Sequence, residues 1–417
     1  MLLFGRVRVS ASFIFFNIVV IFLSLLNRKL NTFFLYFWLW GLIVFEIIDI
    51  IFLIVQLLQR NKIRLARTAP DSVTEDDLAN VEFTVKNVSP LPVYNICIED
   101  SLGAVSKEKT KKFFLSSIPK KGSRNLTYDI QCAKRGKYIL GPIKIYFFDI
   151  LGMLSFSRRS PVYSTLYVYP RTFAVPTFPP LTKGNLPWFG VETRRVSGDE
   201  DEFFGTREYR QGDPIRRIHW LSTARKGQLI VKEFQSFSFY KATVVFVLNK
   251  EENEGQGKES VAEYTVRIAS SVSKYLLKNN ISLEIVAHAG KMFHLPANRG
   301  IQYLDETMKF FASVKPESRV RIGELAREFS PAVASDSTLI VITTDKSLDD
   351  LSQFLFLGSY NIAIIPILIL SSTFREDAIA EDKPMYLQRV SFAAFEKTGL
   401  SPFLVSKGDN LERLFSP

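Results

Sequence analysis

Two long apolar runs near the amino terminus constrain the fold of this 417-residue chain more than any other feature. The first, residues 11–26, carries no charge, and the second, residues 33–58, is interrupted only by Glu46 and Asp49. As helices they measure about 24 Å and about 39 Å, against about 30 Å for the hydrocarbon core of a bilayer. The pattern predicts a two-helix transmembrane hairpin over residues 1–60, with Glu46 and Asp49 facing the partner helix or the membrane surface.

The charges that flank the two runs indicate the orientation of the hairpin. Basic residues such as Arg8 and Arg60 precede the first run and follow the second, whereas only Arg28 and Lys29 lie in the turn. Positive charge is enriched on the cytoplasmic side of membrane proteins, so we expect the soluble domains in the cytoplasm. A cleaved signal peptide is the alternative, but no convincing small-x-small cleavage site follows Leu26. The sequence predicts a multi-pass protein of the bacterial inner membrane.

Residues 61–170 alternate apolar and polar side chains at a period of two, with turn residues between the runs. The clearest runs are residues 81–86, 93–98, 138–140, 143–148 and 166–169. This pattern predicts a small β-sandwich of immunoglobulin-like type, although the Cys, Trp, Cys arrangement of a true immunoglobulin domain is missing. Cys97 and Cys132 both lie in this segment and are expected to stay reduced in the cytoplasm.

From residue 241 to residue 417 the pattern changes, because short continuous apolar runs alternate with segments of helical spacing. The predicted strands are residues 243–248, 282–287, 338–343 and 361–370. The predicted helices are residues 261–278, 302–313, 322–329 and 348–356. Continuous apolar strands that alternate with helices are typical of a parallel sheet buried on both faces. The sequence therefore predicts a doubly wound α/β domain.

Residues 171–240 differ from both neighbouring segments. Their first part, residues 171–187, is rich in proline and threonine and predicts an irregular connector. Residues 198–234, called the signature block below, combine charged, glycine and aromatic residues at a density that suits neither a solvated linker nor a buried strand. We predict that the charged side chains form a fixed lattice of ion pairs. The residues of interest are Arg207, Glu208, Tyr209, Arg210, Gly212, Asp213, Arg216, His219, Trp220 and Arg225.

The signature block resembles that of the domain of unknown function 58 family, whose members carry a similar run of Arg-Glu-Tyr, Gly-Asp, Arg and an aromatic residue before Ala-Arg. Two further segments agree in the same order: residues 135–142 (RGKYILGP) followed by 149–152 (DILG), and residues 168–171 (VYPR). The resemblance implies that the carboxy-terminal domain is similar to a von Willebrand factor A domain. It also implies partners, because such proteins are often encoded beside MoxR-type AAA+ ATPases and other membrane-anchored A-domain proteins.

The signature block admits three functional interpretations. As a docking element it presents a surface to such an ATPase, and the protein is then a membrane-anchored adaptor or scaffold for assembling or remodelling protein complexes. As an enzyme site it offers His219, Glu208 and Asp213 for acid and base chemistry, but without an identifiable nucleophile. As a nucleic-acid surface it offers arginines beside Tyr209 and Trp220, but the neighbouring acidic run repels phosphate. The docking interpretation is favoured, and no nucleic acid is expected.

The loop after the first strand of the α/β domain is the candidate metal site. A domains bind Mg²⁺ there through Asp-x-Ser-x-Ser and a later Asp, because hard cations need several oxygen ligands. Here Asn249 and Glu251 stand at the matching spacing, with Asp345 in the later loop, but Lys250 brings a positive charge beside them. A polar loop is favoured over a magnesium site, and no cofactor is expected.

The net charge of +11 calls for an anionic partner. Much of the excess lies beside the predicted membrane runs or on a lysine-rich stretch between residues 107 and 121. Membrane lipid headgroups explain this distribution more simply than nucleic acid. The sequence contains no Walker loop, dinucleotide glycine fingerprint or nucleophile elbow, so ATP hydrolysis, hydride transfer and serine hydrolysis have no support.

Overall fold

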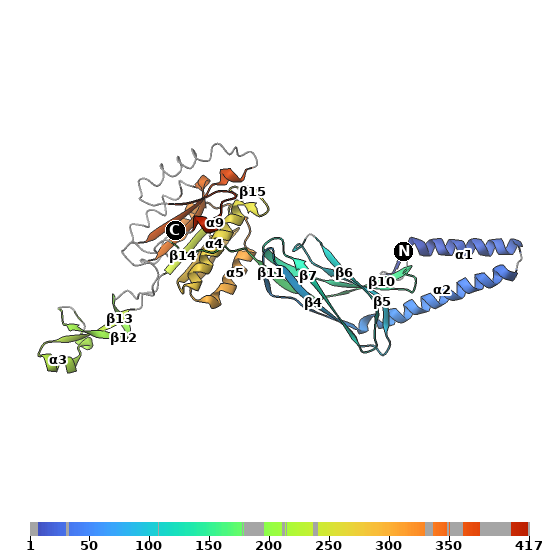
Figure 1. Cartoon of the computed structure of the whole chain (residues 1–417), viewed down its shortest axis with the longest axis horizontal. Helices are drawn as coiled ribbons and strands as arrows, with labels where there is room; N and C mark the ends of the chain where they lie inside the picture. Colours follow the sequence, from blue (N-terminus) through green and yellow to red (C-terminus); the bar gives the residue numbers. More distant parts are fainter. Residues whose placement is uncertain are drawn as a thin grey trace. The chain divides into compact units, whose positions relative to one another are not determined.

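The computed structural model describes residues 7–30, 33–106, 108–176, 178, 196–210, 213, 215–236, 241–329, 337–347, 350, 362–375 and 402–415. The chain divides into two compact units, one of residues 1–171 with 309–313 and the other of residues 172–308 with 314–417. Figure 1 follows the elements of both units from blue at the amino terminus to red at the carboxy terminus. Each unit is described by itself below.

The first unit opens with two apolar helices, as the sequence predicts. A short strand, β1 (Val7–Val9), precedes helices α1 (Ala11–Leu30) and α2 (Phe33–Gln59). Both helices are long and apolar enough to cross a membrane. Asp49 has a different partner from the expected one, because its Oδ1 accepts a hydrogen bond from the backbone N–H of Ile150 at 2.8 Å. The second half of α2 is therefore joined to the β domain that follows it.

A 3₁₀ turn, η1 (Arg60–Lys62), leads from α2 into the β domain. Its strands are β2 (Ile63–Thr68), β3 (Ser72–Thr74), β4 (Leu78–Asn87), β5 (Val93–Ser101), β6 (Thr110–Ile118), β7 (Ser123–Gln131), β8 (Gly136–Leu140), β9 (Ile143–Phe148), β10 (Leu154–Ser160) and β11 (Ser164–Tyr169). They form sheets in the orders β1-β10-β9-β5-β6, β2-β4-β7 and β3-β11-β8. The runs that the sequence predicts as strands in this domain are all present.

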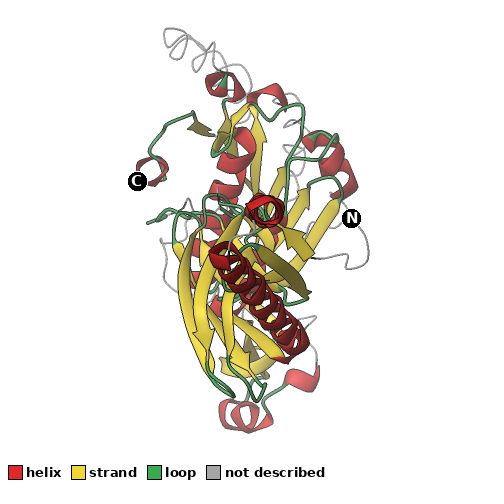
Figure 2. Ribbon diagram, turned by 90° about the vertical axis from the view of Figure 1, so that its right-hand side faces the viewer, coloured by secondary structure: helices red, strands yellow, loops and turns green. Residues whose placement is uncertain are grey.

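The sheets of this domain pack face to face around two apolar clusters. Phe83 and Val85 of β4 pack against Ile96, Ile145 and Phe147 of the five-stranded sheet. Along β4 the side chains alternate between exposed and buried, which is the pattern of a strand with one face on a core. The sequence periodicity predicts the sandwich because that alternation is already visible in the residue types. Figure 2 shows the strands, in yellow, gathered into sheets.

Gly141, in the RGKYILGP segment, occupies a position that only glycine suits. Its φ is +104°, a backbone conformation that side chains with a Cβ rarely adopt. A Cβ added there would lie 2.3 Å from the carbonyl oxygen of Val162. The glycine of this segment is therefore explained by the close approach of two backbones inside the sandwich.

The second unit contains a mostly parallel six-stranded sheet. Its strands are β14 (Lys241–Val247), β17 (Ser282–His288), β18 (Met292–Asn298), β19 (Thr338–Thr344), β20 (Ala363–Ile369) and β21 (Phe403–Val405), in the order β18-β17-β14-β19-β20-β21. Neighbouring strands are parallel except β18, which is antiparallel to β17. The sequence predicts the four central strands but misses β18 and β21 at the edges.

The connections of this sheet contain two short strands and several helices. They are β15 (Gly255–Gln256), β16 (Glu259–Ser260), α4 (Val261–Lys278), η3 (Ile301–Tyr303), α5 (Leu304–Ser313), α6 (Ile322–Phe329), η5 (Asp345–Ser347), η7 (Ser371–Phe374) and α9 (Leu411–Leu414). The bounds of α4 and α6 match the prediction, whereas the helix predicted over residues 348–356 falls almost entirely outside the described residues. Ser260 begins α4, because its Oγ accepts the backbone N–H of Glu263 at 3.4 Å.

Both faces of the sheet are covered. Leu325 and Phe329 of α6 pack against Val245 of β14, together with neighbours on β17 and β19. Val244 and Phe246 point to the opposite face by strand alternation and are also fully buried. Strands buried on both faces require continuous apolar sequence, which explains the apolar runs at residues 244–247 of β14 and 339–342 of β19.

The signature block forms a β-ribbon with a helical insertion, which the sequence does not predict. Strand β12 (Val196–Glu208) pairs antiparallel with β13 (Ile230–Ser236). Between them lie a 3₁₀ turn, η2 (Ile215–Arg217), and the helix α3 (Trp220–Lys226). Helix α3 ends at Gly227, whose φ of 66° is left-handed and whose backbone N–H donates to the carbonyl of Thr223.

Candidate functional site

An ion pair between Arg207 and Asp213 lies at the end of the signature ribbon. Arg207 donates from Nη1 to Oδ2 of Asp213 at 2.7 Å and from Nη2 to Oδ1 at 2.8 Å. The backbone N–H of Arg210 donates to the same Oδ2 at 2.8 Å. The hydrogen bond from Arg207, helped by that from Arg210, lowers the pKa of Asp213 to about 2. Asp213 therefore stays ionised at neutral pH and holds the turn, which makes it a poor general base.

His219 and Tyr209 fix α3 against the ribbon. The backbone N–H of His219 donates to the carbonyl of Ile230 at 2.7 Å, and that of Tyr209 donates to Leu229 at 2.9 Å. The His219 Nδ1 lies 2.6 Å from Oγ of Ser222 in the first turn of α3. These contacts give His219 a role in positioning the helix.

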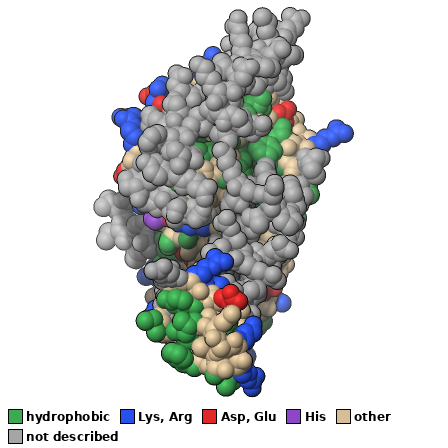
Figure 3. All heavy atoms as spheres, turned by 90° about the vertical axis from the view of Figure 1, so that its left-hand side faces the viewer, with side chains coloured by type: hydrophobic (Ala, Val, Ile, Leu, Met, Phe, Trp, Pro, Cys, Tyr) green, Lys and Arg blue, Asp and Glu red, His purple; other side chains and the backbone are tan. Residues whose placement is uncertain are grey.

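Three large apolar side chains cover the outside of this region. Ile215, Trp220 and Leu221 are 69%, 64% and 63% exposed. The interior is filled by other residues, since Ile218 is buried and forms a β-bridge with Val231. The same insertion carries the exposed basic residues Arg216, Arg225 and Lys226. Figure 3 faces this side of the molecule and shows hydrophobic side chains, in green, beside Lys and Arg, in blue.

The exposed tip, defined here as Ile215, Arg216, Trp220, Leu221 and Arg225, contains only part of the predicted site. Glu208 and Arg210 are exposed on the ribbon, and Gly212 lies outside the described residues. Sequence reasoning missed Ile215 and Leu221. No local signal separates exposed Ile215 from buried Ile218, since residues three apart share one face of a helical turn.

The residues proposed as metal ligands do not converge. Asn249 accepts the backbone N–H of Glu251 through Oδ1 at 2.8 Å and donates from Nδ2 to the carbonyl of Val320 at 3.2 Å. Asp345 Oδ1 accepts both the backbone N–H and the hydroxyl of Ser371. Within the part of the chain that the structure describes, no group of three His, Cys, Asp or Glu side chains is placed to hold a metal ion. The side chains present do not fit a magnesium site.

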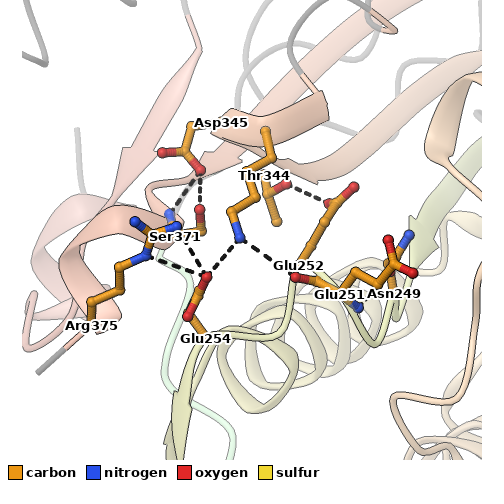
Figure 4. Close-up of polar contacts among 9 residues, drawn as sticks. Asn249, Glu251, Glu252, Glu254, Thr344, Asp345, Ser371 and Arg375 are labelled. Atoms are coloured by element: carbon orange, nitrogen blue, oxygen red, sulfur yellow. Dashed lines mark hydrogen bonds and ion pairs between the residues drawn. The ribbon is translucent and has the colours of Figure 1, made fainter.

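Two other glutamates occupy this edge of the sheet, and sequence reasoning missed both. Glu252 accepts hydrogen bonds from Thr344 Oγ1 at 2.5 Å and from Ser347 Oγ at 2.6 Å. Glu254 accepts from Lys346 Nζ at 2.7 Å and from Arg375 Nη2 at 3.2 Å. Figure 4 shows these side chains reaching across from separate loops.

Lys346 neutralises the carboxylate of Glu254 at the end of the sheet where these loops lie. Its hydrogen bond lowers the pKa of Glu254 against the opposing effect of burial. Because an ammonium group already neutralises the carboxylate, a metal cation gains little there. The loops that follow β14, β19 and β20 are fastened to one another by side chains.

A buried glutamate, Glu284, lies near the start of β17, at the end of the sheet opposite to the loops just described. Glu284 accepts hydrogen bonds from Lys241 Nζ and His294 Nε2, each at 2.8 Å, and from Thr243 Oγ1 at 2.9 Å. Burial alone would raise the pKa of Glu284, but the hydrogen bonds from Lys241, His294 and Thr243 hold it below its ordinary value.

Replacing this carboxylate is expected to make stability depend less on pH. Glu284→Gln should lower the unfolding free energy by about 1–3 kcal/mol at pH 7, because it removes hydrogen bonds to a charged group. A carboxylate whose pKa is lower in the folded state stabilises the fold at a pH above its unfolded pKa of about 4.3. This stabilisation is lost as the pH falls through the folded-state pKa. Calorimetry should therefore find a stability gap between variant and parent at pH 7 that narrows as the pH falls below the unfolded pKa of about 4.3. A gap independent of pH would contradict the assignment.

The comparisons with known proteins concern sequence more than structure. Residues 205–382 match the sequence profile of a family described as "Protein of unknown function DUF58". The chain is 22% identical over 314 residues to the uncharacterized protein YeaD of Bacillus subtilis strain 168, an alignment that covers 69% of this chain and 71% of YeaD. The family profile contains the tip and most of the parallel sheet.

Solved structures are similar only to short stretches. The CARDB domain of the PF1109 protein from Pyrococcus furiosus matches 23% of this chain and 85% of its own, with 18% identity and a TM-score of 0.18. The PKD domain of an M14-like peptidase from Thermoplasmatales archaeon SCGC AB-540-F20 matches 25% of this chain and 91% of its own, with 17% identity and a TM-score of 0.17. TM-scores this low do not establish a shared fold.

Proposed function

We propose, from the premise that this chain belongs to the DUF58 family through residues 205–382, that it is a membrane-anchored adaptor. Helices α1 and α2 anchor it as a multi-pass protein in the bacterial inner membrane, with the soluble domains in the cytoplasm. The exposed tip of the signature block binds a partner protein. By family resemblance we propose as partners a MoxR-type AAA+ ATPase, which assembles or remodels protein complexes, and other membrane-anchored A-domain proteins.

The composition of the exposed tip is the observation that supports binding of a partner protein. Trp220 and Leu221 begin helix α3 and are mostly exposed, while Ile218 and Val231 are the buried apolar residues that join the insertion to the ribbon. The packing of the insertion therefore does not explain Trp220 and Leu221. Tryptophan and arginine are the residue types that contribute most to protein–protein binding, usually beside other apolar side chains. The Arg207–Asp213 pair fixes the turn that carries the tip, so little ordering is needed on binding.

The two folded domains are proposed to act as a spacer and a scaffold. An immunoglobulin-like sandwich follows the membrane anchor along the chain. The order β18-β17-β14-β19-β20-β21, with an antiparallel β18 at the edge, supports a doubly wound, von Willebrand factor A-like domain. Strands β17 and β18 are added on one side of β14, and β19 to β21 on the other. Such sheets bind ligands at this switch point, between β14 and β19, and Glu252 and Glu254 fasten the loops there. This domain therefore works without the metal that A domains use.

The alternatives to the adaptor are an enzyme and a nucleic-acid-binding protein. An enzyme would need a substrate cleft around Arg207, Asp213 and His219, and all three already make contacts within the ribbon. A nucleic-acid binder would use Arg216 with Trp220 for phosphate contact and stacking. Binding to RNA or DNA that weakens steeply with salt and is lost in Arg216→Ala would favour the second of these.

The test is an affinity pull-down of the full-length protein from its own membranes, followed by mass spectrometry. Arg216→Ala is compared with the parent chain at matched stability, because Arg216 is exposed at the tip. We expect an AAA+ ATPase that the parent enriches and the variant loses. Equal recovery of the ATPase by both chains would place the docking surface elsewhere, and no enrichment by either would end the adaptor proposal.

A further inference from the structure

The loop between β9 and β10, residues 149–153, lies where both apolar helices meet the sandwich. Asp49 of α2 accepts the backbone N–H of Ile150 at 2.8 Å. Ser10, directly before α1, donates its backbone N–H to the carbonyl oxygen of Met153 at 2.9 Å. The loop is therefore fixed both to the start of α1 and to the second half of α2.

The lengths of the helices place the membrane surface near this loop. Helix α1, with 20 residues, is about 30 Å long, which equals the thickness of a hydrocarbon core. The part of α2 between Phe33 and Asp49 is about 24 Å long and completes a hairpin of similar depth. Tyr36 and Trp38, exposed near the other end, are residue types enriched at the membrane–water boundary. Asp49 and its loop therefore lie about one membrane thickness away from that end.

Beyond Asp49, helix α2 presents two different faces. One face is buried on the sandwich, where Leu53 joins the core and Gln56 Nε2 donates to the carbonyl of Tyr94 at 2.6 Å. The opposite face remains apolar and exposed at Ile51, Ile54 and Leu58. An apolar stripe that continues from a spanning helix is typical of a segment at the lipid boundary. The lipid boundary therefore lies beyond Asp49 along α2. The loop of residues 149–153, which contacts Asp49, is then on the lipid side of that boundary.

The side chains of the loop suit that position. Ile150 and Leu151 are adjacent and are 44% and 47% exposed, although the core of the sandwich is close by. Burial, opposed by a hydrogen bond from Leu154 and reinforced by the nearby Asp49, raises the pKa of Asp149 to about 6. A carboxyl group that is easily neutralised is compatible with a neighbouring apolar medium.

We propose that the loop of residues 149–153 inserts into the lipid bilayer through Ile150 and Leu151 and holds the sandwich on the membrane surface. This inference rests on the membrane anchor of the proposed function and goes beyond it, because it gives the sandwich its own lipid-binding site. The orientation of the sandwich is then fixed at three points: α1, α2 and the loop.

The test uses the full chain in liposomes of phosphatidylcholine and phosphatidylglycerol, with an environment-sensitive NBD fluorophore on a single introduced cysteine. Ile150→Cys reports the loop, and Phe22→Cys on α1 reports the bilayer interior. Ile139→Cys is the matched control, because Ile139 is 59% exposed on β8, in a different sheet of the same domain. Cys97 and Cys132 are buried, and burial raises the pKa of both thiols, so they react slowly with the label.

We expect quenching by spin-labelled lipid at positions 150 and 22, and quenching by aqueous iodide that is roughly threefold or more weaker at position 150 than at position 139. If position 22 is quenched by lipid while position 150 behaves like position 139, the loop lies in water and this inference is wrong. If position 22 is not quenched by lipid either, the membrane anchor itself is wrong, and the inference fails with it.

Discussion

Asp100→Ala is expected to destabilise the β-sandwich by about 3–5 kcal/mol, because it leaves a buried guanidinium group without its partner. Arg67 and Asp100 have almost no exposed side-chain surface. Arg67 donates from both Nε and Nη2 to the Asp100 carboxylate, and Tyr128 donates its hydroxyl to the same group. Arg67 Nη1 has no hydrogen-bond partner among the described residues, so Asp100 is its main compensation.

Hydrogen exchange in β4 and β7 measures this effect, since it reports opening of the sandwich alone rather than of the whole chain. Asp129→Ala is the surface control, because Asp129 bonds only to an exposed Asn80 in the described structure, and its expected cost is below about 0.5 kcal/mol. Replacing Arg67 and Asp100 together by Met and Leu should cost much less than Asp100→Ala alone. A double variant as unstable as the single one would show that packing, not the buried charge, dominates.

Trp220→Ala combined with Leu221→Ala is expected to weaken binding of the captured ATPase by about 30-fold or more. A loss of that size corresponds to about 2 kcal/mol, the threshold for residues that dominate an interface. Both side chains are mostly exposed, so stability should change little. The measurement is the dissociation constant between the full-length chain in lipid nanodiscs and the purified ATPase that the pull-down identifies.

Ile139→Ala provides the matched control for this second prediction, because it removes an equally exposed apolar side chain from the sandwich. Its affinity should equal that of the parent. An unchanged dissociation constant in the Trp220 and Leu221 variant would show that the tip is not the docking surface. A variant that melts early would instead assign these residues a structural role, against their exposure.

Part of the candidate site was predictable from residue types alone. The concentration of charged and aromatic residues in the signature block predicts ion pairs between its arginines and its carboxylates, and Arg207 and Asp213 do form one. The backbone N–H of Arg210 joins this pair, and the rest of the predicted lattice stays a prediction. The ribbon, the exposure of Ile215 and the positioning role of His219 depend on the pairing of β12 with β13, which no local pattern encodes.

The sequence by itself determined the features that depend on neighbouring residues. The apolar helices, the alternating strands of the sandwich, and the limits of α4 and α6 follow from periodicity, because a helix or strand buries its own face at a fixed spacing. The broken metal motif was also readable, since Lys250 and the missing aspartate are facts of sequence.

Only the tertiary structure decided which distant groups meet. The side chains of Glu252 and Glu254, rather than those of Asn249 and Glu251, reach the end of β19, 92 residues further along the chain, and the loop after β20, 121 residues further along. Asp49 meets Ile150 across 101 positions, and Arg67 meets Asp100 across 33. Edge strands such as β18 and β21 form because a neighbouring strand offers free backbone groups. Such contacts depend on chain topology, which brings together residues whose local sequences carry no record of one another.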